Sequence, residues 1–327
     1  MKPINQFKID FEREGLDVIF LKNWSSGFFS NCRILLKSVK EFNPDVVVAF
    51  MFIAIIFARL LKLLVNFKLI STIRISVINN KWYLPFRITS FLDDGVVYNS
   101  KASKIRFESR KLVSKEGVVI YNGITLPQLK APQPENPFRQ FSWVCIGHFR
   151  YNKDYQTLFK AIAQLKDKNF KVTILGELNN QTWPFKVIEE LGIEEYVQIL
   201  GFRPNAVEYL EDADAFVLSS FSEGMPNAIL EAMAHGKPVV ATNIEGNHEV
   251  ITESEGGFLN ELANPEDLAD KMLAIMKMTP AKRFVLGNNG RRLIEANFAE
   301  EKVMLHWLNV VKQISGKQAL QLNKQYA

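Results

Sequence analysis

Hydrophobic strands and helices alternate throughout the second half of the chain, and this alternation restricts the possible folds more than any other feature. Strands are expected at residues 141–147, 170–176, 197–201, 215–220 and 238–242, and helices at 154–166, 183–192, 226–235 and 265–278. Strands that are apolar throughout are typical of a parallel sheet with helices on both faces. The sequence therefore predicts an α/β fold whose ligand lies at the carboxyl ends of the strands.

The first half shows a less regular version of the same alternation. Strands are expected at 16–22, 44–50, 69–75, 94–100 and 117–123, with helices at 31–43 and 52–67. Residues 46–65 are apolar apart from Arg59 and Lys62, so a transmembrane span has to be considered. The β-branched residues behind Pro44 instead favour a buried strand, and the apolar run that remains is too short to cross a bilayer. The apolar helix is then either part of a core or a contact with a membrane surface.

A proline-rich segment separates the two halves. Four prolines lie between residues 123 and 140, a density that stops both helix and sheet. A chain of 327 residues is also long enough for two domains. The expected organisation is a first domain at 1–125, a linker at 126–140, a second domain at 141–298, a helix at 299–315 that packs back toward the first domain, and a polar tail at 316–327.

Charge is distributed unevenly between the halves. Residues 1–130 contain 20 Lys and Arg against 10 Asp and Glu, whereas residues 131–327 contain 20 against 25, so the first half is basic. A one-sided positive field suits anionic lipid, a lipid phosphate or nucleic acid. Ordinary solvated surfaces are the alternative explanation. No zinc-finger, RNP-like or basic-zipper pattern accompanies the charge, so nucleic acid is the least favoured partner.

Cysteine and histidine usage argues against a disulfide framework and a zinc site. Cys32 and Cys145 lie far apart without metal-type spacing, and the four histidines do not cluster. Residues 1–15 contain no apolar core of a signal peptide. We therefore expect reduced thiols, no bound metal and a cytoplasmic chain.

Two glutamates, Glu223 and Glu231, lie eight positions apart in a segment that is otherwise small or apolar. Pro226 suits a first helical turn and Gly236 suits the position after a last one, so the helix expected at 226–235 contains Glu231. A carboxylate in so apolar a helix is costly unless it is paired or hydrogen-bonded. The plainest explanation is a salt bridge or a helix cap. Alternatively, Asn227 and Glu231 share a face and jointly bind a polyol such as a ribose diol.

Glu223 lies in the loop between an expected strand and this helix. Gly224 allows close approach of a ligand to the backbone, and free N–H groups at the start of a helix attract anions. A carboxylate beside an anion site suits a ligand with hydroxyls next to phosphates. A nucleotide sugar is such a ligand.

This Glu-x7-Glu segment, "SEGMPNAILEAMAHGKPVVAT", resembles the donor-binding motif of the family 4 glycosyltransferases, retaining enzymes of the GT-B fold. The similarity continues through 146–165, 201–220 and 256–272. It is strong over about 141–275 and weak in the first domain. The resemblance implies two Rossmann-like domains with parallel sheets facing across a cleft. It also implies that no cofactor or metal is needed, with the nucleotide sugar as co-substrate.

The resemblance assigns roles to individual residues. Glu223 would contact the hydroxyls of the donor sugar, and Glu231 the ribose hydroxyls. The main chain facing sugar and diphosphate would be that of Gly224, Met225, Pro226 and Asn227. The loop containing Phe202 and Arg203 would line the base pocket.

The phosphate-binding pair of the family is only partly present. Its Lys is Lys153, but the position of its Arg, after the strand-ending Gly147, holds His148. A histidine cannot form the bidentate fork of an arginine, so Arg150 is the candidate replacement. Lys153, Arg150 and the helix start would stabilise the departing diphosphate without a metal. The Asp-x-Asp sequence at 212–214 precedes a strand and is interpreted as polarity at its entry, not as a metal site.

The first domain would hold the acceptor. Relative to the family, the first strand and its Gly-rich loop are not recognisable in the opening residues. The histidine often found after the strand at 44–50 is missing as well, with Phe50 in its neighbourhood. Arg74 is the acceptor-side candidate, and a surface arginine is the alternative reading.

Three functions fit these observations. The first is a retaining hexosyl- or N-acetylhexosaminyltransferase. It would transfer a sugar from a nucleotide-diphosphate donor, with a UDP-sugar favoured, to a lipid-linked or saccharide acceptor. The reaction would belong to capsule, lipopolysaccharide or glycolipid synthesis. Its basic half would contact the inner membrane surface. The alternatives are a catalytically impaired donor-binding subunit and another GT-B enzyme such as a nucleotide-sugar epimerase. No strand is followed by Gly-x-Gly-x-x-Gly, which disfavours a nicotinamide enzyme.

Overall fold

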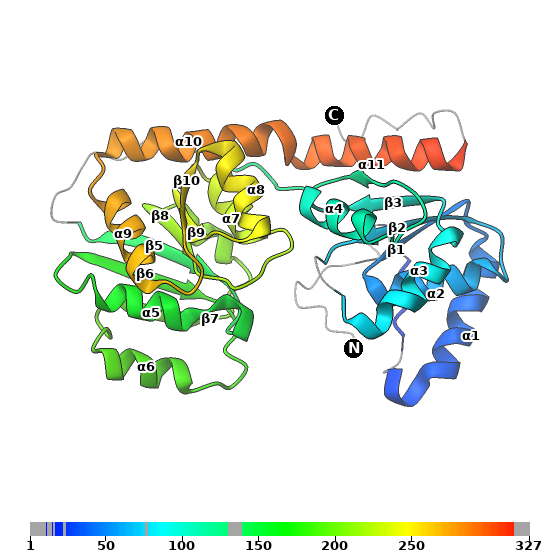
Figure 1. Cartoon of the computed structure of the whole chain (residues 1–327), viewed down its shortest axis with the longest axis horizontal. Helices are drawn as coiled ribbons and strands as arrows, with labels where there is room; N and C mark the ends of the chain where they lie inside the picture. The colour runs from blue at the N-terminus through cyan, green and yellow to red at the C-terminus, as the bar shows by residue number, and fades with distance from the viewer. Residues whose placement is uncertain are drawn as a thin grey trace.

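Two α/β lobes, each built on a parallel sheet, lie side by side in the computed structural model of the chain (Figure 1). The structure describes residues 11, 15, 17–21, 24–75, 78–129 and 139–316. Most of the opening residues for which the sequence makes predictions therefore lie outside the described part, as does the stretch 130–138 of the proline-rich segment.

The first lobe is built on a parallel sheet of order β1-β2-β3-β4. Its strands are β1 (Val46–Phe50), β2 (Lys68–Ile73), β3 (Gly95–Tyr98) and β4 (Val118–Val119), and its helices are α1 (Trp24–Phe42), α2 (Phe52–Lys62), α3 (Tyr83–Thr89) and α4 (Lys101–Ser109). These strands confirm four of the five expected there. The strand expected at 16–22 is wrong over residues 17–21, which have no regular structure. Val18, Ile19 and Phe20 are exposed, so among the described residues this segment has neither a partner strand nor a core to stabilise it.

The helices of this lobe differ from expectation at their ends. The helix expected at 31–43 begins earlier, at Trp24, with a kink at Gly27. The apolar helix ends at Lys62 and not at 67, because the chain turns there to enter β2. Within the described residues no helix has the length and apolarity to cross a membrane.

Arg59 explains how a charge fits into the apolar α2. Its fully buried guanidinium donates to both carboxylate oxygens of Asp93, from Nε at 2.8 Å and from Nη2 at 2.5 Å. Arg59 Nη1 also donates to the carbonyl of Phe86 at 2.8 Å, and the Ser71 hydroxyl donates to Asp93 at 2.7 Å. This network joins α2, β2 and the segment after α3 inside the core of the first lobe.

The second lobe contains a parallel sheet of order β10-β9-β8-β5-β6-β7. The strands are β5 (Phe141–Ile146), β6 (Phe170–Leu175), β7 (Val197–Gly201), β8 (Ala215–Leu218), β9 (Val239–Thr242) and β10 (Gly257–Asn260). The helices are α5 (Tyr155–Ala163), α6 (Trp183–Leu191), α7 (Asn227–Ala234), α8 (Glu245–Ser254), α9 (Pro265–Met276) and α10 (Pro280–Asn297). All five expected strands are confirmed. We had not predicted α8, β10 or α10, because the two helices are polar and the strand is short and opens on glycine.

The last helix, α11 (Glu300–Ser315), crosses from the second lobe to the first (Figure 1). Val303 and Val310 pack with Ile70, Val97 and Ile120 of the first lobe. Backbone hydrogen bonds between Ile124 and the start of α11 fasten this crossing. The lobes also meet through ion pairs from α4 to α8, among them Lys101 with Glu253 at 3.0 Å.

Candidate functional site

The expected site residues gather where the order of strands reverses in the second sheet. From β5 the chain adds β6 and β7 on one side, and it returns to place β8, β9 and β10 on the other. The carboxyl ends of β5 and β8 are therefore neighbours at a topological switch point, the usual position of a ligand in such sheets. The loop after β5 carries Gly147, His148 and η3 (Tyr151–Lys153), and the loop after β8 carries Glu223.

Lys153 and Glu223 form an ion pair at this point. Lys153 Nζ lies 2.6 Å from Glu223 Oε1, and the two side chains are only 17% and 12% exposed. The Ser220 hydroxyl donates to the same carboxylate oxygen at 2.6 Å. An ammonium group has three donors, so Lys153 can keep Glu223 and still bind an anion.

The two loops are fastened to each other by short-range contacts. The Ser219 hydroxyl donates to the carbonyls of Lys153 and Asp154 at 3.1 and 2.9 Å, and the Phe221 amide donates to the carbonyl of Asn152 at 2.7 Å. A side chain at Gly147 would come within 3.3 Å of Lys153 Cε. Because Gly147 has no side chain, Lys153 can lie close to the backbone at the end of β5.

His148 contacts the loop after β6 and the loop after β7. Its Nδ1 accepts a hydrogen bond from the amide of Glu177 at 3.0 Å, which requires Nδ1 to be unprotonated. Its ring stacks with that of Phe202, the centroids being 6.3 Å apart. The contact with Phe202 places His148 beside the loop that carries Arg203, whose Nη1 donates to the carbonyl of Phe202.

Arg150 is exposed at the start of η3. Its backbone is held in a turn by His148 and Lys153, but its guanidinium has no hydrogen bond or ion pair within the described residues. It is therefore available to a ligand, although no contact of the protein orients it.

Glu231 is half-buried on α7. Within the part of the chain that the structure describes, no group pairs with its carboxylate, so the salt bridge or cap considered from the sequence is not observed. Burial raises the pKa of Glu231 to about 7. Its backbone carbonyl accepts a hydrogen bond from the amide of His235 and lies 2.8 Å from His235 Nδ1. An unpaired carboxylate in this position is suited to accept hydroxyl groups from a ligand.

The pKa of Glu231 leads to a testable pH dependence. The folded chain holds the proton more tightly than the unfolded chain. The stability contributed by this group is therefore complete below the ordinary pKa of 4.5 and lost as pH rises to about 7. Glu231→Gln should raise the free energy of unfolding of the ligand-free chain by up to about 3 kcal/mol at pH 8, with little effect at pH 4.5. Urea unfolding at both pH values measures this, with the exposed Glu189→Gln as matched control. Equal effects of Glu231→Gln at the two pH values would contradict the assignment.

Asn227 faces the first lobe. Its side-chain oxygen accepts a hydrogen bond from the amide of Asn122, which follows β4. The Asn122 oxygen in turn accepts a hydrogen bond from Arg74 Nη2, at the end of β2. Asn227 thus contacts the first lobe, and its binding of a polyol together with Glu231 stays a prediction. The helix also begins one residue later than expected, with Pro226 as the capping residue.

The Asp-x-Asp sequence lies just before β8, where Asp214 forms hydrogen bonds that hold the start of this strand. Asp214 accepts hydrogen bonds from the Ser142 amide at 2.8 Å and from Arg139 at 2.9 Å, at the opposite end of β8 from Glu223. The described residues include no cluster of three or more His, Cys, Asp or Glu that would hold a metal ion. Cys32 and Cys145 are both free thiols.

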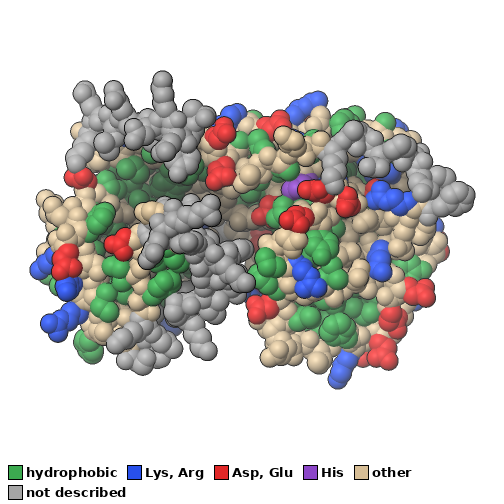
Figure 2. Space-filling model, turned by 180° about the vertical axis from the view of Figure 1, so that it is seen from behind, with side chains coloured by type: hydrophobic (Ala, Val, Ile, Leu, Met, Phe, Trp, Pro, Cys, Tyr) green, Lys and Arg blue, Asp and Glu red, His purple; other side chains and the backbone are tan. Residues whose placement is uncertain are grey.

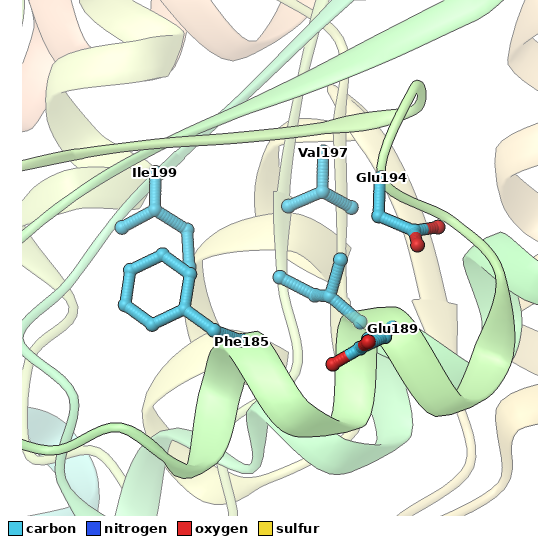
Figure 3. A pocket seen from close by; sticks show the side chains of 6 residues that line it. Phe185, Glu189, Glu194, Val197 and Ile199 are labelled. Atoms are coloured by element: carbon cyan, nitrogen blue, oxygen red, sulfur yellow. The ribbon is translucent and has the colours of Figure 1, made fainter.

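A groove of about 350 Å³ lies elsewhere, between α6 and the edge strand β7 (Figure 3). It is lined by Phe185, Ile188, Glu189, Glu194, Val197 and Ile199. None of the residues expected to bind a ligand belongs to it. Several residues that build the site were not predicted: Ser219, Ser220, Asn152, Glu177 and Asn122. The two serines after β8 could have been found, since hydroxyls at the end of an apolar strand are common in binding sites.

Comparison with known proteins identifies the family of the chain. Residues 130–293, half of the chain, match the family described as group 1 glycosyl transferases. The chain belongs to this family. The match contains Lys153, Glu223 and Glu231, the residues on which the site is built.

Relatives and solved structures extend the comparison. An uncharacterized glycosyltransferase of Methanocaldococcus jannaschii is 26% identical over 73% of this chain and 64% of its own length. The N,N'-diacetylbacillosaminyl-diphospho-undecaprenol alpha-1,3-N-acetylgalactosaminyltransferase of Campylobacter jejuni is 32% identical over 40% of this chain and 34% of its own. The match thus covers less than two thirds of either relative. HepE of Anabaena, solved in complex with UDP-glucose, aligns with a TM-score of 0.81 over 94% of this chain and 89% of that chain, at 20% identity. The fold of this chain is GT-B.

Proposed function

We propose that this group 1 family member is a retaining, metal-independent glycosyltransferase that uses a UDP-sugar. The observation that carries the proposal is the Lys153–Glu223 pair at the switch point. Glu231, whose carboxylate pairs with no described residue, lies on the helix that follows Glu223. Lys153 binds the diphosphate, Glu223 the sugar hydroxyls and Glu231 the ribose diol. The UDP-glucose complex of HepE supports the choice of uridine.

The chemistry follows from where the charges lie. The bond between the anomeric carbon and the phosphate oxygen breaks, and the acceptor oxygen joins the anomeric carbon on the same face. The proton of the acceptor hydroxyl passes to the departing diphosphate. Lys153 and Arg150 stabilise the negative charge that develops on that group, so no metal ion is required.

The acceptor is a lipid-linked or free saccharide, and the sugar transferred is a hexose or an N-acetylhexosamine. The name of the Campylobacter relative specifies a lipid-diphosphate acceptor, and a basic first half suits such a substrate. Such an acceptor would belong to the synthesis of capsule, lipopolysaccharide or glycolipid, and we propose that the reaction takes place on the cytoplasmic side of the membrane.

Thermal unfolding with UDP, GDP or ADP in EDTA tests the donor site. A diphosphate at about 100 times its Kd should stabilise the chain by about 2.7 kcal/mol. We expect this effect for UDP. The absence of stabilisation by all three would contradict the proposal. Stabilisation by UDP without sugar transfer would instead favour a catalytically impaired donor-binding subunit, the alternative that the engaged Nδ1 of His148 supports. Consumption of the nucleotide sugar without an acceptor or water as recipient would point to an epimerase.

A peripheral membrane contact completes the proposal. Leu84, Ile88 and Phe91 are 65%, 59% and 65% exposed at helical spacing on α3 and just after it, and Lys81 and Arg87 flank them. Hydrophobic side chains also reach the surface of the first lobe in several places in Figure 2. Apolar side chains beside cations match the chemistry of an anionic bilayer.

Vesicle sedimentation measures this contact. The chain should bind phosphatidylglycerol vesicles and not phosphatidylcholine vesicles. Reversing both charges, Lys81→Glu with Arg87→Glu, should weaken binding by at least about 30-fold, since each cation near the surface contributes about 1 kcal/mol. The matched control reverses Lys160 and Lys186 on the second lobe. Equal losses of vesicle binding in both double variants would show that net charge alone matters. Such a result would refute a membrane contact through Leu84, Ile88 and Phe91.

A further inference from the structure

Arg74 is a half-buried cation without an anion. It follows β2, and its guanidinium lies over the ring of Phe50, with Cζ 5.6 Å from the ring centroid. Its hydrogen bond from Nη2 goes to a neutral amide oxygen, that of Asn122. Among the described carboxylates none pairs with Arg74, in contrast to Arg59, whose charge Asp93 neutralises. Burial without such a partner lowers the pKa of Arg74 and makes an anionic ligand favourable.

The position of Arg74 is set from both lobes. Asn122 accepts from Arg74 with its oxygen and donates to Asn227 with its amide, so two consecutive hydrogen bonds connect β2 to the first residue of α7. Asn227 belongs to the segment that follows Glu223. Arg74 therefore approaches the proposed donor site from the first lobe, whereas Lys153 belongs to the second.

The second lobe supplies one oriented cation where two would be expected. Lys153 is held by Glu223, but His148 is an acceptor at Nδ1 and Arg150 is not oriented by any described residue. A diphosphate leaving group carries more charge than one ammonium group neutralises. An arginine is the side chain best suited to share it, because its planar fork binds two phosphate oxygens.

We propose that Arg74, positioned by Asn122, binds a phosphoryl group between the lobes and acts as the second cation of the site. The inference rests on the proposed function. The phosphoryl group has two sources of identical chemistry, the diphosphate of the donor and the phosphate of a lipid-linked acceptor. Asn122 is a positioning residue, since it acts through Arg74.

Calorimetric titration of UDP and of uridine, without acceptor, tests the donor source. Arg74→Gln should weaken UDP binding about 10-fold or more and leave uridine binding unchanged, because charge-assisted hydrogen bonds to phosphate are lost. Asn122→Ala should weaken UDP binding in the same direction but less. The matched control is Arg33→Gln, an exposed arginine on α1 of the same lobe that should alter neither affinity. Thermal unfolding of each free variant verifies that it is folded.

The acceptor source is tested by the KM for a polyprenyl-diphosphate sugar against that for the same sugar without phosphate. If Arg74→Gln raises the KM for the polyprenyl-diphosphate sugar alone and leaves the affinity for UDP unchanged, the phosphoryl group belongs to the acceptor. Unchanged UDP affinity and unchanged KM values would overturn the inference. Failure of the wild-type chain to bind UDP would instead overturn the proposed function, so the two failures are distinguishable.

Discussion

Lys153→Ala should reduce kcat/KM for sugar transfer by about 100- to 1,000-fold, the usual loss when one preorganised group that stabilises transition-state charge is removed. The lysine is held at 2.6 Å from Glu223, so it is oriented before a ligand arrives. UDP stabilisation in thermal unfolding should fall in parallel. The exposed Lys186→Ala is the matched control. Full activity of Lys153→Ala with normal UDP stabilisation would exclude the lysine from the site.

The Lys153–Glu223 pair also makes the two side chains non-additive. Glu223 is only 12% exposed beside Lys153, and Lys153→Ala leaves its carboxylate without this cation. Among the described side chains, the Ser220 hydroxyl then remains as its donor. We expect Glu223→Gln and the double variant Lys153→Ala with Glu223→Gln to be about as inactive as Lys153→Ala alone, because residues that act as a unit fail together. Multiplicative losses in the double variant would show that the two residues act independently.

Asp93→Ala should lower the free energy of unfolding by about 3–5 kcal/mol, since it leaves the Arg59 guanidinium buried without a counter-charge. Both side chains of this pair are completely buried. Urea unfolding measures the loss. Lys68→Ala serves as the surface control, because Lys68 pairs with Asp94 but its side chain is 55% exposed. This variant should lower the free energy of unfolding by less than about 1 kcal/mol.

The double variant Arg59→Met with Asp93→Leu separates charge from packing. Replacing both members of a buried pair by apolar residues of similar volume is often nearly neutral. The double variant should therefore be more stable than Asp93→Ala. If it is equally unstable, the loss arises from packing around Arg59 or from the Phe86 and Ser71 hydrogen bonds and not from an unpaired charge.

The chain illustrates which local signals suffice for an element and which do not. The apolar strands β5 to β9 were predictable, because an uninterrupted β-branched run between turn residues has few other conformations. The segment 17–21 has a similar pattern but forms no strand, because strand pairing is not a property of the segment itself. The polar helices α8 and α10 do form, although their sequences show no clear helical pattern, because packing against their neighbours stabilises them.

By itself the sequence determined the α/β class, the strands of the second sheet and the two glutamates with their helix, because these depend on periodicity and on residues close in the chain. Only the tertiary structure decided which partners the charged groups have. Lys153 meets Glu223 because β5 and β8 are neighbours at the switch point, and Arg74 reaches Asn227 through Asn122 because the lobes approach there. Strand order and lobe contact are set by the burial of the whole chain, and no spacing within one segment encodes them.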